Sequence, residues 1–341
     1  MHLRRSGRVG RLGIEPRTRG STQEEPSAVA GLGRPECSHS FIERHGNFAG
    51  MTTGEGAVLV TGATGSVGRF VVSSLTEQGV PVRRAVTKIE PGASGDQVRF
   101  DFADPRTWEG ALDGVDRVFL MRPPAISDVK GVIGPFITAL ARQPIKATVV
   151  LSLMGVNRAM PHWQLEHDVK AAGVPWVMLR PAFFMQNLQT AYLSDIRDHD
   201  RIRLPAGRGK TSFIDTRDIA DVATLAMTEP KRHTGNAYTL TGGQALGWST
   251  VASMLSAELG RPIDYQPVGL LTARREMTAQ QLPKAYVNVQ LLINVVARLG
   301  LAAKITDELP QLLGRPPRLL SQYLTDNREC WTGNLASQDE H

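Results

Sequence analysis

The sequence predicts an α/β fold: a Rossmann-type, doubly wound parallel sheet with a smaller C-terminal α/β region. Two observations support this prediction. Short apolar runs alternate with amphipathic stretches of helical length from residue 57 to about residue 240, which is typical of a parallel sheet with helices on both faces. In addition, a glycine-rich turn, TGATGSVG, joins the first apolar run to the first helix.

The first half of the chain supplies the elements of this sheet in order. AVLVT at 57–61 is bounded by glycines and predicts a buried strand, and residues 68–78 predict a helix that Gly79 ends. Asp104 and Pro105 mark another helix start, because Asp caps a helix well and Pro is tolerated in its first turn. Further strands are expected at 80–87, 97–100, 116–121, 146–152 and 175–180, and further helices at 128–142 and 160–172.

The second half is expected to contain more helix than strand. Asp218 leads an expected helix at 218–227, and Gly260 ends another that begins at residue 248. The stretch 284–300 has apolar residues at helical spacing, which would suit a lid or a dimer face, with core packing as the default. Strands are also expected at 237–243 and 263–268, and a helix at 271–280. The apolar residues at helical spacing in 284–300 are Val287, Leu291, Val295 and Leu299.

Composition argues against several classes of function. Residues 1–50 hold eight arginines and five acids, so half of the net charge of +6 lies there and the rest is nearly balanced. This argues against a nucleic-acid partner. No apolar run approaches the ~20 residues of a membrane span. Cys37 and Cys330 are the only cysteines, which excludes a disulfide framework and fits the reducing cytoplasm.

The glycine turn predicts a site for a dinucleotide. Gly62 permits a tight turn, Gly65 leaves room for a pyrophosphate, and Gly68 lets the helix pack close to the sheet. Backbone N–H groups at the helix start would then face the phosphates. No GxxxxGK[ST] loop is present, so the turn is not an ATPase signature. The residues expected at the phosphates are Gly62, Thr64, Gly65, Ser66, Val67 and Gly68.

The end of the second strand bears on the choice of cofactor. An NAD-specific site usually has an acid there for the ribose, but residues 81–89 contain none. They do contain Arg83, Arg84 and Lys88, which could meet the 2′-phosphate of NADP. The arginine pair is equally well read as surface charge, and Lys88 lies nearer the carboxyl end of the strand.

Six segments give the chain, from about residue 57 to 331, a resemblance to the NmrA-like, atypical short-chain dehydrogenases. The chain looks most like their NAD(P)H quinone reductases and ergot-alkaloid-type reductases. The segments are TGATGSVG, RFDFADP (99–105), VDRVFLM (115–121), LRPAFFMQN (179–187), FIDTRDIADVA (213–223) and LGRPPR (313–318).

The resemblance implies a site for NADP(H), with NAD(H) as the alternative. Family members often have Arg where this chain has Thr87, and Lys88 beside it would substitute only as a point charge. The resemblance assigns Asp101 and Phe102 to the adenine, Met121 and Arg122 to the ribose and pyrophosphate, the stretch from Ser152 through Met154 to Gly155 to the nicotinamide, and Phe184 and Asn187 to the substrate.

Four parts of the chain are therefore expected. Residues 1–53 lack a lasting period and are interpreted as a disordered extension, with a true start at Met51 or a targeting arm as alternatives. Residues 54–240 would form the NAD(P)-binding Rossmann domain. Residues 241–331 would form a substrate or lid region packed on it, and 332–341 a disordered tail.

MPHWQLEHD at 160–168 occupies the helix that carries Tyr-x-x-x-Lys in typical short-chain dehydrogenases, and it offers His162 and Glu166 instead. No tyrosine of the chain has a lysine four residues later. Three interpretations remain. A metal site would need a third ligand, and none is evident. A proton-transfer pair is chemically reasonable, because Glu166 could orient His162 or raise its pKa. An ordinary helix face would leave His167 and Asp168 in solvent.

The missing Tyr–Lys pair favours an acceptor that needs no acid, quinone-like or iminium-like, over a simple ketone. Apolar residues near the expected substrate site, Phe183, Phe184, Met185, Leu188 and Tyr192, suggest a small apolar or aromatic acceptor. We expect an oxidoreductase, monomeric or homodimeric. The alternative is a non-catalytic NADP(H)-binding redox sensor that acts through a protein partner.

Overall fold

The computed structural model describes residues 56–332, apart from residues 90–91, 93–94 and 283. The expected disordered extension at 1–53, the candidate start at Met51, and residues 333–341 of the expected tail lie outside the described residues.

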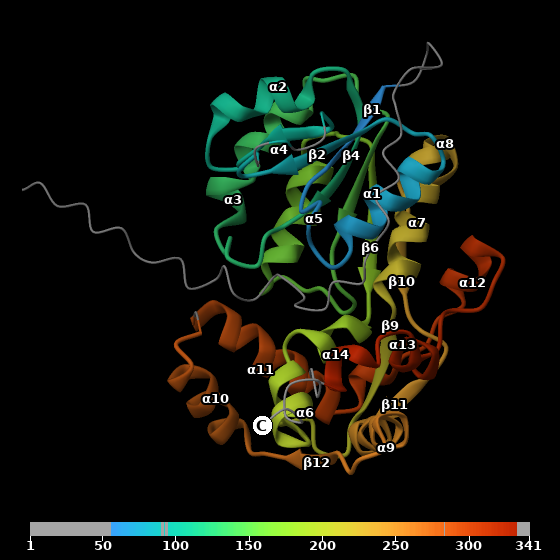
Figure 1. The fold of residues 1–341 in the computed structure, drawn as a ribbon. Helices are drawn as coiled ribbons and strands as arrows, with labels where there is room; N and C mark the ends of the chain where they lie inside the picture. Colours follow the sequence, from blue (N-terminus) through green and yellow to red (C-terminus); the bar gives the residue numbers. More distant parts are fainter. Residues whose placement is uncertain (1–55, 90–91, 93–94, 283, 333–341) are drawn as a thin grey trace, which may run out of the picture.

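A seven-stranded parallel sheet forms the upper part of the molecule in Figure 1. Its strands are β1 (Ala57–Val60), β2 (Val82–Val86), β3 (Gln97–Arg99), β4 (Val115–Met121), β5 (Ala147–Leu151), β6 (Trp176–Pro181) and β10 (Ala237–Leu240). They lie in the order β3-β2-β1-β4-β5-β6-β10, and every neighbouring pair is parallel. The order reverses between β1 and β4, where doubly wound sheets bind their ligands. The predicted fold class is confirmed.

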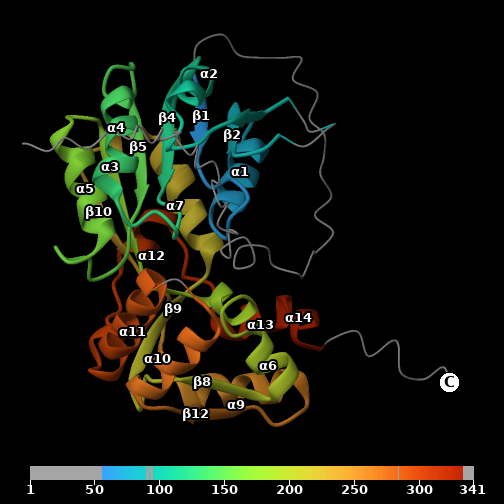
Figure 2. The same ribbon diagram turned by 90° about the vertical axis from the view of Figure 1, so that its left-hand side faces the viewer.

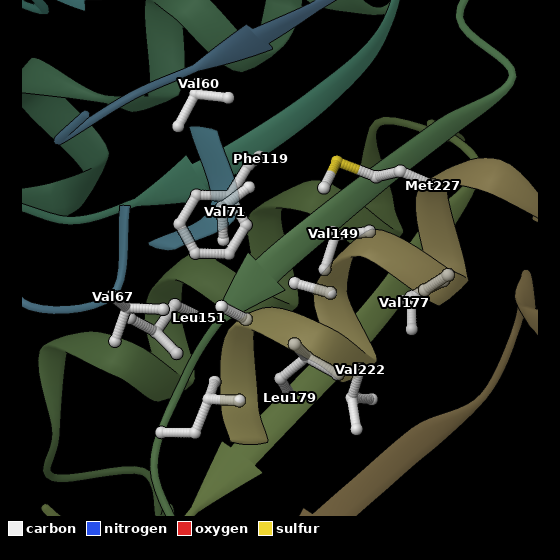
Figure 3. Close-up of a cluster of buried hydrophobic side chains, with 14 of the residues drawn as sticks. Val60, Val67, Val71, Phe119, Val149, Leu151, Val177, Leu179, Val222 and Met227 are labelled. Atoms are coloured by element: carbon white, nitrogen blue, oxygen red, sulfur yellow. The ribbon is translucent and has the colours of Figure 1, made fainter. Parts of the chain in front are cut away.

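Helices cover both faces of this sheet. On one face, α1 (Gly68–Glu77) packs beside α7 (Thr216–Thr228). Their apolar side chains meet those of the strands in a buried core, where Val71 and Val222 lie near Phe119, Val149 and Val177 (Figure 3). Each of these side chains is almost fully buried, because the apolar spacing of the two helices matches the inward face of the sheet.

The other face carries α2 (Trp108–Leu112), α3 (Val129–Val132), α4 (Gly134–Leu140) and α5 (Pro161–Ala171). Its core includes an aromatic cluster of Phe100, Phe102, Trp108 and Phe136, with ring centroids between 4.8 and 5.6 Å apart. The single helix expected at 128–142 is wrong, since two helices fill that range. Pro135 has no N–H to donate, so the hydrogen-bond ladder breaks beside it.

The smaller region lies below the large sheet in Figure 1 and contains two small sheets. One consists of β7 (Phe183–Phe184), β9 (Lys210–Ile214) and β11 (Ala245–Gly247), and the other of β8 (Arg201–Leu204) and β12 (Asp264–Pro267). The helices around them are α6 (Leu193–His199), α9 (Trp248–Leu259), α10 (Leu270–Ala279), α11 (Lys284–Arg298), α13 (Leu320–Asp326) and α14 (Glu329–Thr332) (Figure 2).

The core of the smaller region is assembled from two separate stretches of chain. Phe183 and Phe213 come before the expected boundary at residue 240, yet their rings pack edge-on against Trp248, which follows it. The indole of Trp331 donates to the carbonyl oxygen of Leu188 at 3.0 Å. The domain boundaries therefore stay a prediction, but residues 183–214 share a core with the C-terminal helices.

An ion-pair network fastens the C-terminal stretch to α7. The expectation that Asp218 leads this helix is wrong: the helix begins at Thr216, and the Asp215 side chain caps it by accepting from the amide of Arg217 at 2.8 Å. Asp218 is fully buried instead. It accepts from Arg315 Nη2 and from the amide of Arg318, each at 2.8 Å, and pairs with the Arg318 guanidinium.

Helix α11 accounts for only part of the expected apolar stripe. Val287 is buried, Leu291 and Val295 are half-buried, and Leu299 lies past the end of the helix with 68% of its surface exposed. Among the described residues, no single helix is long and apolar enough to cross a membrane. The segments Tyr286–Arg298 and Leu301–Leu313, bent by 81° between them, meet that criterion only as a pair and only by length and composition.

Candidate functional site

The glycine turn between β1 and α1 has the shape that a pyrophosphate requires. Gly62 has a φ of +62°, and a Cβ there would overlap the Met121 side chain. A Cβ on Gly68 would lie 2.8 Å from the carbonyl carbon of Gly62, so turn and helix are in backbone contact. The N-cap residue Val67 makes no side-chain cap, and the Gly68 amide at the start of α1 is left for an external acceptor, whereas the Arg69 amide already donates to the Gly65 carbonyl oxygen at 3.2 Å. These residues fit the phosphates of a dinucleotide.

The side chains of the turn divide between core and surface. Val67 is 1% exposed and belongs to the core beneath α1, whereas Ser66 is half-buried and Thr64 is exposed. Thr61 holds the base of the turn: its hydroxyl donates to the Phe119 carbonyl oxygen at 3.0 Å and accepts from the Met121 amide at 2.8 Å. This joins the ends of β1 and β4 and sets Met121 against the glycines.

The end of β2 presents one accessible cation beside the expected ribose. Thr87 and Lys88 are both exposed. Arg84 pairs with Asp96 at 2.7 Å, and Arg83 pairs with Asp113 at 3.7 Å, so both arginines serve as surface charge. Lys88 therefore fits a 2′-phosphate better than either arginine does.

The two residues predicted at the adenine behave differently. Asp101 is exposed, and its carboxylate accepts from the Ala103 amide at 2.8 Å. Phe102 is 5% exposed, and its ring packs against Phe100 and Phe136 in the aromatic cluster. The Phe102 side chain is therefore a core group, and only Asp101 offers its side chain at this edge of the sheet.

A buried chain of hydrogen bonds joins Ser152 to Glu166 and Arg180. The Ser152 hydroxyl donates to Glu166 Oε1 at 2.6 Å. Arg180 donates through Nε to Oε1 at 2.9 Å and through Nη2 to Oε2 at 2.6 Å, a two-pronged pair. Ser152 and Glu166 are each 4% exposed. Because the Ser152 proton is held by Glu166, the hydroxyl oxygen is left to accept hydrogen bonds from a ligand.

Glu166 is ionised in this arrangement. Burial by itself raises the pKa of the Glu166 carboxyl, but hydrogen bonds from Arg180 and Ser152 outweigh it, and the pKa lies below its ordinary value. Glu166 therefore anchors Ser152. The Glu166 carboxylate is held by Ser152 and Arg180 and not by His162.

His162, in the first turn of α5, is uncharged at neutral pH. Burial, helped by the nearby Arg122 guanidinium and only partly opposed by Glu166, lowers its pKa from 6.5 to about 4. Glu166 does act to raise the pKa of His162, as expected, but burial and Arg122 outweigh it. Arg122 is itself folded back onto its own loop, donating to the carbonyl oxygen of Pro123 at 3.0 Å. The catalytic roles of His162 and Glu166 stay a prediction.

The rest of MPHWQLEHD forms the outer face of α5. His167 is exposed and its ring stacks on Trp163 with centroids 5.0 Å apart. Asp168 is half-buried and accepts from Gln164 Nε2 at 2.6 Å. In the described part of the chain, no three His, Cys, Asp or Glu side chains are grouped so as to hold a metal ion.

The loop after β5 borders a cavity of about 240 Å³. Met154, assigned above to the nicotinamide, lies in its wall, and Arg180 closes one side. The loop is fixed by β6, because the amides of Ser152 and Met154 donate to the carbonyl oxygens of Leu179 and Pro181. Phe184 and Asn187, predicted at the substrate, are both half-buried, with Phe184 packed against the core of the large sheet.

Arg180 is the residue that the sequence reasoning missed. It stands in the segment LRPAFFMQN, but its partner Glu166 lies 14 positions earlier, on a helix. A signal was available: an arginine near the end of a buried strand needs a carboxylate close by. The preceding helix α5 offers two acids, Glu166 and Asp168, and Glu166 is the buried one.

Comparison with known proteins agrees with the fold and with the resemblance that the six sequence segments indicate. The profile of the NmrA-like family matches residues 54–306. An NAD(P)H azoreductase of Xenophilus azovorans is 35% identical, over 78% of this chain and 96% of its own. A (4-alkanoyl-5-oxo-2,5-dihydrofuran-3-yl)methyl phosphate reductase of Streptomyces griseus is 31% identical, over 80% and 99%. The solved structure of an NADPH-dependent quinone oxidoreductase of Escherichia coli with NADPH has a TM-score of 0.69, 22% identity, and coverage of 79% and 99%.

Proposed function

Because the chain belongs to the NmrA-like family, we propose that it is an NAD(P)H-dependent oxidoreductase that reduces a small apolar acceptor. The observation that carries the proposal is the uncapped glycine turn at the β1–β4 switch point, with the Ser152–Glu166–Arg180 chain two strands away in the same sheet. The NAD(P)H azoreductase and the (4-alkanoyl-5-oxo-2,5-dihydrofuran-3-yl)methyl phosphate reductase, relatives at 35% and 31% identity, support it. A cytoplasmic location and a monomeric or homodimeric state remain predictions.

The chain binds NADP(H) or NAD(H). Gly62, Gly65 and the amides of Thr64, Ser66, Val67 and Gly68 hold the pyrophosphate. Lys88, with Thr87 beside it, meets the 2′-phosphate of NADP, and Asp101 borders the adenine. Met121 and Arg122 would run beside the ribose and pyrophosphate, and Ser152 and Met154 would border the nicotinamide.

The acceptor is of a kind that needs no strong acid. When bound, the reduced nicotinamide supplies a hydride, which carries two electrons and one proton. A quinone that takes up a hydride becomes a hydroquinone monoanion, stable enough in water to receive its second proton from the solvent afterwards. An iminium carbon becomes a neutral amine. A ketone becomes a strongly basic alkoxide, and His162, with a pKa of about 4, is not a cationic acid at neutral pH.

His162 and Phe184 border the acceptor, and Asn187 offers it an amide. Neutral His162 donates at most a weak hydrogen bond to a carbonyl oxygen. Glu166 acts through Ser152, whose hydroxyl oxygen it turns toward the ligand as an acceptor. Proximity and alignment over the nicotinamide then supply most of the rate.

The test measures binding and turnover separately. NADPH binding is titrated first, and NADPH oxidation is then followed with a quinone, an iminium and a simple ketone. We expect binding with turnover of a quinone-like or iminium-like acceptor. Reduction of ketones with quinones left untouched would contradict the acceptor class. Tight binding with no turnover on any acceptor would favour the non-catalytic redox sensor.

A pair of matched variants tests the cofactor site. Gly65→Asp places a carboxylate beside the pyrophosphate, since a Cβ there already lies 3.2 Å from the Gly62 carbonyl oxygen, and should abolish NADPH binding. Gly110→Asp adds the same group in α2, where nothing lies within 4 Å of an added Cβ, and should bind normally. Unchanged NADPH affinity in the first variant would refute the site.

A further inference from the structure

The cavity beside the β5–α5 loop has an apolar opening. Leu301 in the short helix Leu301–Ala303 lines it and is 65% exposed. Leu299 and Ile305, close to it in sequence, are 68% and 40% exposed. An exposed aliphatic side chain in the wall of a cavity offers apolar surface to a ligand. The volume of about 240 Å³ is slightly below the roughly 300 Å³ at which small-molecule pockets usually begin, so a compact ligand fits best.

Two cations line this cavity. Arg180 enters from β6, and Lys304 enters from the segment that follows Leu301–Ala303. The pair with Glu166 uses Nε and Nη2 of Arg180, which leaves Nη1 directed elsewhere, and the side chain is 30% exposed. Lys304 is exposed, and no carboxylate in the described part of the chain forms an ion pair with it.

The acids near the cavity are occupied by other donors. Glu166 is 4% exposed and held by Ser152 and Arg180. Glu308, the other acid that acts on Arg180, accepts from the Thr239 amide at 2.6 Å and stands in the first turn of α12 (Glu308–Leu313), where the helix N-terminus favours a carboxylate. Neither acid is part of the cavity wall, whose charged side chains are those of Arg180 and Lys304.

We propose that this cavity receives the anionic end of the acceptor, and that the acceptor is a compact aromatic molecule whose anionic group is held by Arg180 and Lys304. The inference rests on the proposed function and narrows it. Met154 belongs both to the cavity wall and to the expected nicotinamide site, so the ring of such an acceptor would border the cofactor. The two cations disfavour a positively charged iminium, which leaves the quinone-like acceptor as the preferred class.

The experiment compares two acceptors that differ by one charge. Naphthoquinone and naphthoquinone sulfonate are reduced by the full-length chain with NADPH, and the ratio of their kcat/KM values is measured in four proteins. These are the wild type, Lys304→Gln, Glu308→Gln, and Lys231→Gln as the matched control. Lys231 is an exposed lysine of α8 (Pro230–His233), at the far end of the large sheet from the smaller region (Figure 1).

In Lys304→Gln, the ratio of kcat/KM for the sulfonate to that for the neutral quinone should fall about fivefold, mostly through KM, because one accessible charge contact is lost. Glu308→Gln should raise the ratio, and high ionic strength should lower it in the wild type. Lys231→Gln should leave it unchanged. An unchanged ratio in Lys304→Gln, or an equal fall in Lys231→Gln, would overturn the inference while leaving quinone reduction established.

Failure of the proposed function would look different. If NADPH binds but neither quinone is reduced, the enzymatic proposal fails, and calorimetric titration of naphthoquinone sulfonate still decides the role of the cavity. Weaker binding of the sulfonate to Lys304→Gln than to the wild type supports a site for anionic aromatic ligands. Equal binding, or none to either protein, overturns it.

Discussion

Replacing Gly68 with alanine is the sharpest single test of the cofactor site. Gly68 is the first residue of α1, and an added Cβ would lie 2.8 Å from the carbonyl carbon of Gly62 and 3.1 Å from Cα of Ala63. Both neighbours are backbone atoms of the same turn. They cannot swing away as a flexible side chain could, so the turn itself must move.

The change in the unfolding free energy of Gly68→Ala is the balance of two opposing effects. Alanine in place of glycine favours a helix by up to about 1 kcal/mol, whereas overpacking a tight site costs about 1–3 kcal/mol. The variant should therefore lose roughly 0–2 kcal/mol of unfolding free energy and remain folded. Displaced amides would each forfeit about 1.5–3 kcal/mol of charge-assisted hydrogen bonding, so NADPH should bind at least about tenfold more weakly.

Fluorescence titration with NADPH and urea denaturation measure these two effects. Gly110→Ala is the control, because Gly110 lies in α2 with nothing within 4 Å of an added Cβ. It should bind NADPH like the wild type and gain about 0.5–1 kcal/mol of stability. A folded Gly68→Ala protein with wild-type NADPH affinity would refute the assignment of this turn to the pyrophosphate.

Three further outcomes are expected. Asp218→Ala leaves Arg315 and Arg318 without their buried carboxylate and should lower the unfolding free energy by about 3–5 kcal/mol in urea denaturation. The control Asp113→Ala, at an exposed position, should lower it by less than about 0.5 kcal/mol. Similar losses in the two variants would contradict the buried network. Arg180→Gln should cost about 3–5 kcal/mol by leaving the Glu166 carboxylate buried without its cation, and Arg180→Lys should cost less; equal stability of all three proteins would disprove the anchor. The pKa of His162 is lowered by burial to about 4 from 6.5, so its neutral form stabilises the fold above about pH 6.5 and this stability is lost as the pH falls toward 4. Between pH 7 and pH 5, the unfolding free energy of His162→Asn should therefore fall by about 2 kcal/mol less than that of the wild type. If the unfolding free energies of the two proteins fall equally, the lowered pKa of His162 is excluded.

The large sheet could be predicted from sequence because its signals are local. Each buried strand is an apolar run between turn residues, and the helix start at Asp104 and the glycine turn follow from adjacent residues; the Asp104 side chain does accept from the Arg106 amide. The break at Pro135 is also local, because a proline inside the expected helix 128–142 removes one amide donor.

The site was harder to predict because its key contacts join distant residues. Nothing near Glu166 in the sequence indicates that Arg180, rather than His162, holds its carboxylate. The ring of Phe102 packs into the aromatic cluster against Phe100 and Phe136, so that the place of this residue at the adenine stays a prediction. Asp218 was expected at a helix start, and only the fold brings Arg315 and Arg318 to it from about a hundred positions away.

The way the chain threads between its two cores bears on how a ligand enters. It leaves the large sheet after β6, returns at α7, leaves again after β10, returns at α12, and ends in the smaller core with Trp331. A region tied at so many points cannot swing open about one flexible joint, as two-domain enzymes with a single linker do. Admission of a ligand should therefore depend on rearrangement of side chains and short loops at the rim, such as those around Leu301, so that binding rates would respond to changes there more than to changes in the connections between the two parts.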